Sequence, residues 1–271
     1  SAYLQIAKEK AGEALATPGE ETETRSDTVV VLDFGSQYSL LIARRIRECN
    51  VYCEVLPYNT SVAELKSRNT KGIILSGGPS SVYEKDAPKP DPLLFTCGIP
   101  ILGICYGLQL IGKEMGGKVE PKVIREYGKT PLIIDDEINL FAGLPREIQT
   151  WMSHGDAVTE LPTGFKYLAH TAQSQSAAIG NHAKRIYGVQ FHPEVVHTPN
   201  GLEIIKNFVY LICGCQPTRT TQNFIETTTA EIIATIGKEK ILCALSGGVD
   251  STTVAALVHK ALGDQLTCMF I

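Results

Sequence analysis

The amino-acid sequence predicts an α/β protein built on a doubly wound, mostly parallel β-sheet with flanking helices. Its 271 residues are 44% hydrophobic, which suffices for the core of one domain of about 190 residues and part of a second. From residue 28, short runs rich in β-branched residues alternate with amphipathic stretches, the pattern typical of such a sheet. In chain order, the expected strands and helices lie at 29–32, 40–49, 51–56, 62–69, 73–75, 101–104 and 108–115.

The pattern changes after Gly117, where strand-like segments follow one another closely. Segments at 130–134, 166–170 and 177–180 predict a mixed or antiparallel extension of the sheet. A helix at 201–212 is expected to close this first domain.

Composition divides the chain into three parts. Residues 1–27 include an acidic stretch poor in apolar residues, which predicts a flexible tail, and the missing initial Met suggests a fragment or processed terminus. The main domain is expected at 28–214. Residues 215–271 are expected to be the truncated start of a second α/β domain, whose incomplete sheet would expose an apolar strand and could leave the segment unfolded. Its expected elements lie at 224–236, 241–245, 252–262 and 266–271.

Charge and cysteine content exclude several classes of protein. A net charge of −4 provides no basic surface for a nucleic acid, and the sequence has neither a signal peptide nor a membrane-spanning apolar stretch. The eight cysteines include no pair with C-x-x-C spacing, which favours a reducing cytoplasm and no metal site. We interpret the C-x-C pair Cys213 and Cys215, at the end of a helix, as structural.

The segment Gly103-Ile104-Cys105-Tyr106-Gly107 lies between a strand-like run and a helix-like run. A sharp turn there would expose Cys105 as a nucleophile, as the G-x-S-x-G motif exposes serine. The first glycine would let the helix pack closely, and the second would permit a strained backbone. The alternative is a buried structural cysteine.

A candidate base and its orienting group occur together in Phe191-His192-Pro193-Glu194. Because side chains two residues apart in an extended segment face the same way, Glu194 can hold one ring nitrogen of His192 while the other faces Cys105. The order Cys, His, Glu differs from the Ser, Asp, His order of hydrolases that share the turn, which argues against an esterase. A core histidine is the alternative, and the nearby Glu194 and the cysteine motif argue against it.

The segment Ser76-Gly77-Gly78-Pro79 follows a strand-like run and is a candidate oxyanion hole. The amides of Gly78 and Tyr106 would donate to the negative charge that develops during attack. An ordinary strand-ending turn is the alternative.

Together these segments resemble the triad, or class I, glutamine amidotransferase family. The resemblance covers about 29–214 and continues as LSGGVDS at 245–251. Further matching segments follow in the family's order, namely FGSQY at 34–38, RRIRE at 44–48, SGGPSSVY at 76–83, REYG at 125–128 and SHGD at 153–156.

The resemblance implies a flavodoxin-like fold and glutamine hydrolysis by Cys105, His192 and Glu194. Cys105 would attack the side-chain amide, and His192 would protonate the departing ammonia, leaving a thioester for water. The family also implies Gln109, His154 and Asp156 as glutamine-binding residues, with Asp156 pairing with the α-ammonium group. A capped helix turn and a solvated His-Gly-Asp loop are the alternatives for these residues.

The second part of the chain carries a loop between an expected strand and helix. Glycines, hydroxyl groups and a helix N-terminus suit a phosphate group, and the Gly-Lys-Ser/Thr of a Walker loop is missing. The loop resembles that of the ATP pyrophosphatase family, with an adenine-nucleotide α-hydrolase-like fold, which implies ATP with Mg²⁺ as cofactor. A plain turn is the alternative. The ATP-binding candidates are Ser246, Gly247, Gly248, Val249, Asp250 and Ser251.

Within the amidotransferases, the resemblance points to members that aminate xanthosine monophosphate (XMP) to GMP and form homodimers through a C-terminal domain. The chain stops inside the expected second strand of the pyrophosphatase domain, so alone it is expected to be at most a glutaminase with low, coupled activity. Two alternatives remain, namely an amidotransferase for another acceptor, such as anthranilate or aminodeoxychorismate synthase, and a non-catalytic regulatory remnant.

Overall fold

The structure, a computed structural model, describes residues 27–271 with the exception of the side chains of 122–124 and 221. The tail predicted at 1–27 therefore lies outside the described residues except for Asp27. The Asp27 carboxylate accepts a hydrogen bond from the Gln216 amide at 3.2 Å and lies 3.9 Å from Lys71 Nζ. These contacts join the start of the described chain to Gln216 and to Lys71.

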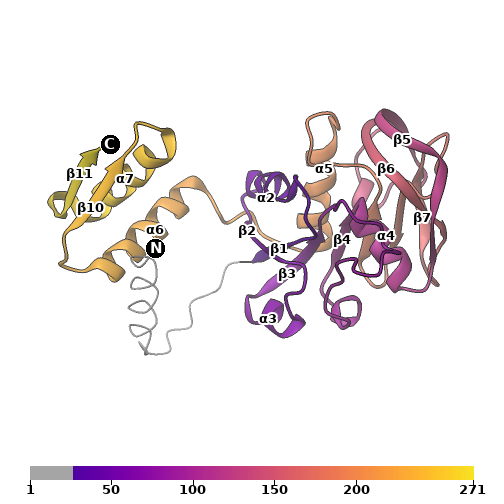
Figure 1. Ribbon diagram of the computed structural model, residues 1–271, viewed down its shortest axis with the longest axis horizontal. Coiled ribbons are helices and arrows are strands. Elements are labelled where there is room, and N and C mark those ends of the chain that lie inside the picture. The colour runs from indigo at the N-terminus through magenta and orange to yellow at the C-terminus, as the bar shows by residue number, and fades with distance from the viewer. Residues whose placement is uncertain (1–26) are drawn as a thin grey trace.

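A nine-stranded sheet forms the first unit, in the order β2-β1-β3-β4-β9-β8-β7-β5-β6 (Figure 1). The five strands from β2 to β9 run parallel, and the pairs from β9 to β6 are antiparallel. The predicted doubly wound α/β fold is thus confirmed. The strands are β1 (Thr28–Asp33), β2 (Tyr52–Pro57), β3 (Thr70–Leu75), β4 (Ile101–Ile104), β5 (Lys118–Ile134), β6 (Glu147–Glu160), β7 (Lys166–His170), β8 (Ala178–Asn181) and β9 (Ile186–Val189).

Helices cover both faces of the parallel half, and the alternation of side chains along β1 shows why. Val29 and Val31 are fully buried in one apolar cluster with Ile42 of α2 (Ser39–Glu48). Val30 and Leu32 are buried in a second cluster on the opposite face. The first cluster includes residues of α2 and α5 (Gly201–Lys206), which continues as a π-helix over Asn207–Ile212, and the second includes residues of α3 (Val62–Ser67) and α4 (Tyr106–Glu114).

The antiparallel half departs from the prediction in two strands, one longer than expected and one unexpected. β5 begins 12 residues before the expected strand at 130–134, and β6 was not expected at all. The SHGD segment consequently lies within β6 rather than in a loop. Buried polar side chains such as Glu126 and His154 interrupt the alternation in both strands, which hides them from a search for hydrophobic periodicity.

The second unit forms a small body of its own with a two-stranded parallel sheet (Figure 1). It contains α6 (Thr221–Ile236), β10 (Ile241–Leu245), α7 (Val249–Leu262) and β11 (Leu266–Phe270). Against the expectation of an unfolded segment, its backbone has a regular α/β arrangement. Its apolar surface is nevertheless exposed as expected, with Phe270 76% and Leu242 63% accessible.

Residues 27–271 lack three features that would stabilise or anchor a protein in other ways. All eight cysteines are free. No group of three or more His, Cys, Asp or Glu side chains in this range is placed to hold a metal ion. No helix of the described chain has both the length and the apolar character needed to cross a membrane.

Cys213 and Cys215 are buried, and burial raises the pKa of Cys215 to about 12, in keeping with a structural role for this pair.

Two glycines allow α4 to lie against the sheet. A Cβ atom on Gly103 would lie 2.4 Å from the carbonyl carbon of Gly107, and one on Gly107 would lie 2.6 Å from Leu75 O. We expect Gly103→Ala and Gly107→Ala each to lower the free energy of unfolding by about 3 kcal/mol, since backbone must shift to admit the methyl group. Urea denaturation measures this change.

Gly155→Ala is the matched control because its nearest neighbour, Arg125 Nε, would lie 3.5 Å from the new Cβ atom. Equal stability of the three variants would show that close approach does not require these glycines.

Candidate active site

Cys105 lies in the turn between β4 and α4, with a backbone that L-residues seldom adopt. Its φ is +53° and its ψ is −103°. The strain therefore falls on the cysteine itself, and Gly103 and Gly107 allow the close packing around it. Strain of about 1–3 kcal/mol at one residue is typical of functional sites. The turn fixes Cys105 at the carboxyl edge of the sheet.

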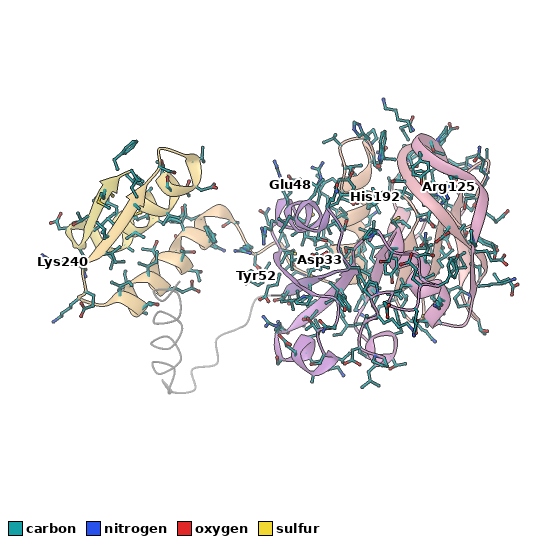
Figure 2. All side chains as sticks on the ribbon, viewed as in Figure 1. Asp33, Glu48, Tyr52, Arg125, His192 and Lys240 are labelled. Carbon is teal, nitrogen blue, oxygen red and sulfur yellow. The ribbon has the colours of Figure 1, made fainter. Side chains whose placement is uncertain are left out.

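His192 and Glu194 lie just beyond β9, the strand next to β4, and form a hydrogen-bonded pair. His192 Nδ1 is 2.8 Å from Glu194 Oε1, and both side chains are buried. Burial disfavours the imidazolium form, but hydrogen bonds and charges of Cys105 and Glu194 outweigh this effect and raise the pKa of His192 to about 10. The three predicted triad residues thus come together, and the arrangement favours an imidazolium beside the sulfur. Figure 2 shows His192 within the first unit.

The backbone of His192 is fixed by β6 and by Thr198. The His192 amide donates to Trp151 O at 3.0 Å, and Thr198 Oγ1 donates to His192 O at 2.7 Å. Thr198 Oγ1 also accepts from the Trp151 amide at 3.0 Å. The position of the ring is therefore set by the antiparallel half of the sheet as well as by β9.

Ser76 orients the peptide group of the candidate oxyanion hole. Its hydroxyl donates to Gly77 O at 2.8 Å and accepts from the Phe34 amide at 2.9 Å. Because the peptide bond is trans, the Gly78 N–H points to the side opposite the held Gly77 carbonyl. Among the described residues the Gly78 amide has no recorded acceptor, and the Tyr106 amide, at the first position of α4, has no intrahelical one.

The three residues predicted to bind glutamine meet at Asp156. Gln109 Nε2 and His154 Nδ1 both point at the main-chain oxygen of Asp156, at 3.1 and 2.8 Å. Ser81 Oγ donates to Asp156 Oδ2 at 2.7 Å. The Asp156 carboxylate is half-buried, and this arrangement leaves its other oxygen available to a cationic group.

Glu126 of the REYG segment is a buried partner of His154 that the sequence did not reveal. His154 Nε2 lies 3.1 Å from Glu126 Oε2, and Thr171 Oγ1 donates to Glu126 Oε1 at 2.7 Å. Both His154 ring nitrogens thus have an oxygen atom as hydrogen-bond partner, which fixes the orientation of the ring. A polar residue at a buried strand position was the only available signal.

Other residues approach the triad without having been predicted. The Tyr38 ring lies edge-on to His192 at 5.4 Å between centroids, which gives the FGSQY segment a role in covering the base. Gln190, two residues before His192, contacts Cys105 Sγ. Three of the four remaining histidines have partners away from the triad: His170 pairs with Asp135, His182 pairs with Asp136, and His197 stacks on Trp151.

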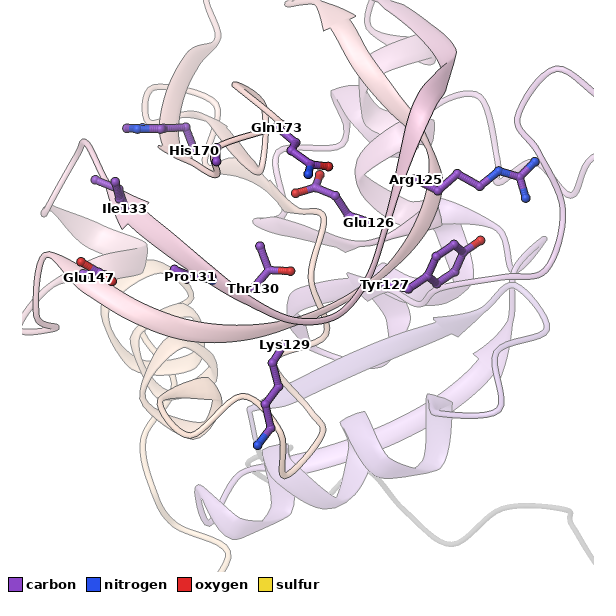
Figure 3. A pocket seen from close by; sticks show the side chains of 11 residues that line it. Arg125, Glu126, Tyr127, Lys129, Thr130, Pro131, Ile133, Glu147, His170 and Gln173 are labelled. Atoms are coloured by element: carbon purple, nitrogen blue, oxygen red, sulfur yellow. The ribbon is translucent and has the colours of Figure 1, made fainter.

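A cavity of about 460 Å³ runs along β5 and does not include the triad. Figure 3 shows Glu147 at the left of the view, Arg125 and Tyr127 at the right, and Glu126 and Gln173 between them. Glu126 lines this cavity and also contacts His154.

The candidate phosphate loop joins β10 to α7. Gly247 has φ +77°, and Gly248 caps α7 without a side-chain hydrogen bond to the first helical amides. Ser246 Oγ and Ser251 Oγ lie 3.2 Å apart on the exposed side of the loop. Free amides, two hydroxyl groups and a helix N-terminus fit the phosphate oxygens of a nucleotide.

The amino-acid sequence of this chain is similar to those of curated proteins from several organisms. The chain is 54% identical over 264 residues to the GMP synthase [glutamine-hydrolyzing] of Gloeothece citriformis, covering 97% of this chain and 49% of that protein. It is 56% identical over 243 residues to the protein of the same name from Thermosynechococcus vestitus, covering 90% and 45%. The chain therefore spans about half the length of the curated relatives it matches.

Solved structures agree with the fold. A Thermoplasma acidophilum protein assigned as one subunit of a GMP synthase has a TM-score of 0.63 and 31% identity, over 74% of this chain and 98% of that one. A glutamine amidotransferase from Thermotoga maritima, at 17% identity, has a TM-score of 0.56 over 70% of this chain and 99% of that one.

Family models divide the chain between them. Residues 220–271 match the NAD synthase model, and residues 30–212 match glutamine amidotransferase class-I. The chain therefore belongs to the class I glutamine amidotransferase family.

Proposed function

We propose that this chain hydrolyses glutamine to glutamate and ammonia at Cys105. The observation that carries this proposal is the hydrogen-bonded pair His192–Glu194 beside Cys105 at the carboxyl edge of the sheet. A thiolate beside an imidazolium is the nucleophile that an unreactive primary amide requires.

The geometry supports a two-step reaction. The Cys105 thiolate attacks the side-chain carbonyl carbon, and the amides of Gly78 and Tyr106 stabilise the resulting oxyanion. The C–N bond then breaks as the His192 imidazolium gives its proton to the amide nitrogen, which departs as ammonia. In the second step His192 takes a proton from water, which attacks the thioester and releases glutamate.

Asp156 is proposed to hold the amino-acid end of the substrate. Its carboxylate would pair with the α-ammonium group, while Gln109 and His154 would act on substrate through the position of Asp156. This assignment is supported by their hydrogen bonds to the Asp156 main-chain oxygen.

In the complete protein, we propose that the ammonia serves ATP-dependent amination of XMP to GMP. The names of the relatives and the match of 220–271 to NAD synthase support this reading over anthranilate-type acceptors and over a regulatory remnant. The loop Ser246–Ser251 would hold phosphate oxygens of ATP, with Asp250 in the first turn of α7 as an acidic side chain suited to the accompanying Mg²⁺. Assembly as a homodimer and a division into domains at about 214 are further parts of the proposal, and the free cysteines are in keeping with a cytoplasmic location.

A diazo-ketone analogue of glutamine tests the glutaminase site directly. We expect labelling confined to Cys105 and prevented by excess glutamine, as measured by peptide mass spectrometry. Cys105→Ala is the control, and the half-buried Cys97 and exposed Cys268 serve as internal comparisons. Labelling spread over these other cysteines would contradict the proposal.

The pKa of His192 predicts the alkaline limit of the reaction. Because this pKa is raised to about 10, the imidazolium that protonates ammonia is present at neutral pH and is lost only as the pH rises through 10. In Glu194→Gln the hydrogen-bonded carboxylate is neutralised, so we expect kcat/KM for glutamine hydrolysis to fall at least one pH unit earlier.

The matched control is Asp136→Asn, which breaks a histidine–carboxylate pair away from the site, with 3.0 Å between His182 Nε2 and Asp136 Oδ2. An unchanged alkaline limit in Glu194→Gln would refute the role given to this carboxylate.

Ser76→Ala tests the orientation of the oxyanion peptide. Loss of its hydroxyl frees the Gly77 carbonyl, so we expect kcat to fall about 10- to 100-fold with little change in KM. Ser174→Ala is the matched control, because this buried hydroxyl has no partner among the described residues. A KM effect with unchanged kcat would point to substrate binding instead.

A further inference from the structure

Gln190 is a buried polar residue beside the nucleophile that neither the triad nor the oxyanion hole uses. Its Nε2 atom lies 3.7 Å from Cys105 Sγ, within the range of a hydrogen bond to sulfur. We propose that Gln190 is a further catalytic residue, which stabilises the Cys105 thiolate by donating a side-chain N–H. This inference deepens the proposed function and rests on Cys105 acting as a thiolate.

The pairing of β4 with β9 brings Gln190 and Cys105 together. β4 and β9 are parallel neighbours with Ile104 opposite Val189, and the Cys105 amide donates to Val189 O at 2.8 Å. Cys105 and Gln190 are therefore the first residues beyond two adjacent strand ends. The Gln190 amide donates to Ala177 O at 2.8 Å, which fixes its backbone on the other side.

The surroundings of Gln190 give it little structural benefit. Its side chain is fully buried, and its Oε1 atom has no hydrogen-bond partner among the described residues. An unpaired buried carbonyl is destabilising, and an apolar side chain of similar length would fill the same space without that penalty. The contact between the Gln190 amide and Cys105 Sγ explains why a polar side chain occupies this position.

The contacts of Cys105 Sγ suit both protonation states. The thiol can donate to Ser153 O, at 3.7 Å, whereas a thiolate can only accept and is met by the amide of Gln190. His192 loses its proton to ammonia during the reaction, so its stabilising charge is temporary. Gln190 does not titrate, and its hydrogen bond therefore remains available when the sulfur leaves the second tetrahedral intermediate.

The pH dependence of Cys105 alkylation by iodoacetamide tests the proposal on the whole chain. A hydrogen bond to a charged group is worth about one pH unit in the midpoint of thiolate formation. In Gln190→Met we expect this midpoint to rise by about one unit, a roughly tenfold loss of thiolate below it. In Gln190→Glu the like charge should raise it further.

Gln149→Met is the matched control, because Gln149 is half-buried on β6 and donates to Thr150 O rather than to sulfur. Its midpoint should equal that of the unaltered chain. The alkylated peptide is identified by mass spectrometry, and melting temperatures show whether each variant is folded. Folded Gln190 variants whose midpoints match that of the unaltered chain would overturn the proposal.

A measurement on the unaltered chain covers the case in which the variants do not fold. The ¹⁵N-labelled side-chain amide of Gln190 should shift in the NMR spectrum with the same pH midpoint as Cys105 alkylation. An amide signal that ignores this titration would overturn the proposal. Failure of the proposed function is separate, since it would appear as no labelling by the diazo-ketone whatever the alkylation midpoints.

Discussion

The alignment of two parallel strand ends is the constraint on which the site depends. The hydrogen bond from the Cys105 amide to Val189 O, at 2.8 Å, continues the register of β4 and β9 past their last paired residues. It holds the strained nucleophile beside the segment that carries Gln190 and His192. A shift of one residue in this register would turn every side chain of β9 to the opposite face and separate base from nucleophile.

Side chains that hold main-chain carbonyl groups then fix the remaining parts of the site. Ser76 holds Gly77 O, Thr198 holds His192 O, and Arg45 Nε donates to Glu194 O at 3.0 Å. Gln109 holds Asp156 O in the same way. In each case the backbone is fixed while the group with a proposed chemical role stays free, which is how a site can be preorganised.

Features that depend on local pattern could be predicted from the sequence, and features that depend on contacts between distant segments could not. The parallel strands follow from short apolar runs, and Cys105, His192 and Glu194 lie in segments that their chemistry makes recognisable. The resemblance to a known family supplied the grouping of glutamine-binding residues. β6 escaped detection because His154 interrupts its alternation, and Glu126 gains a role only once β5 lies beside β6. Motif spacing also does not reveal φ, so the sequence predicted a strained turn without placing the strain at Cys105 itself.

Buried polar atoms without a hydrogen-bond partner occur beside the base and the nucleophile. Among the described residues, four buried side-chain atoms have no hydrogen-bond partner, and two of these, Gln190 Oε1 and Glu194 Oε2, flank the base and nucleophile. Each lies on a side chain whose other polar atom contacts Cys105 or His192. In both side chains one polar atom is committed to the reaction centre, and among the described residues no donor meets the other. The apolar clusters on both faces of the sheet must therefore stabilise the fold enough to offset the free-energy cost of these unpaired atoms. Catalysis thus depends on the packing of α2, α4 and α5 as well as on the triad.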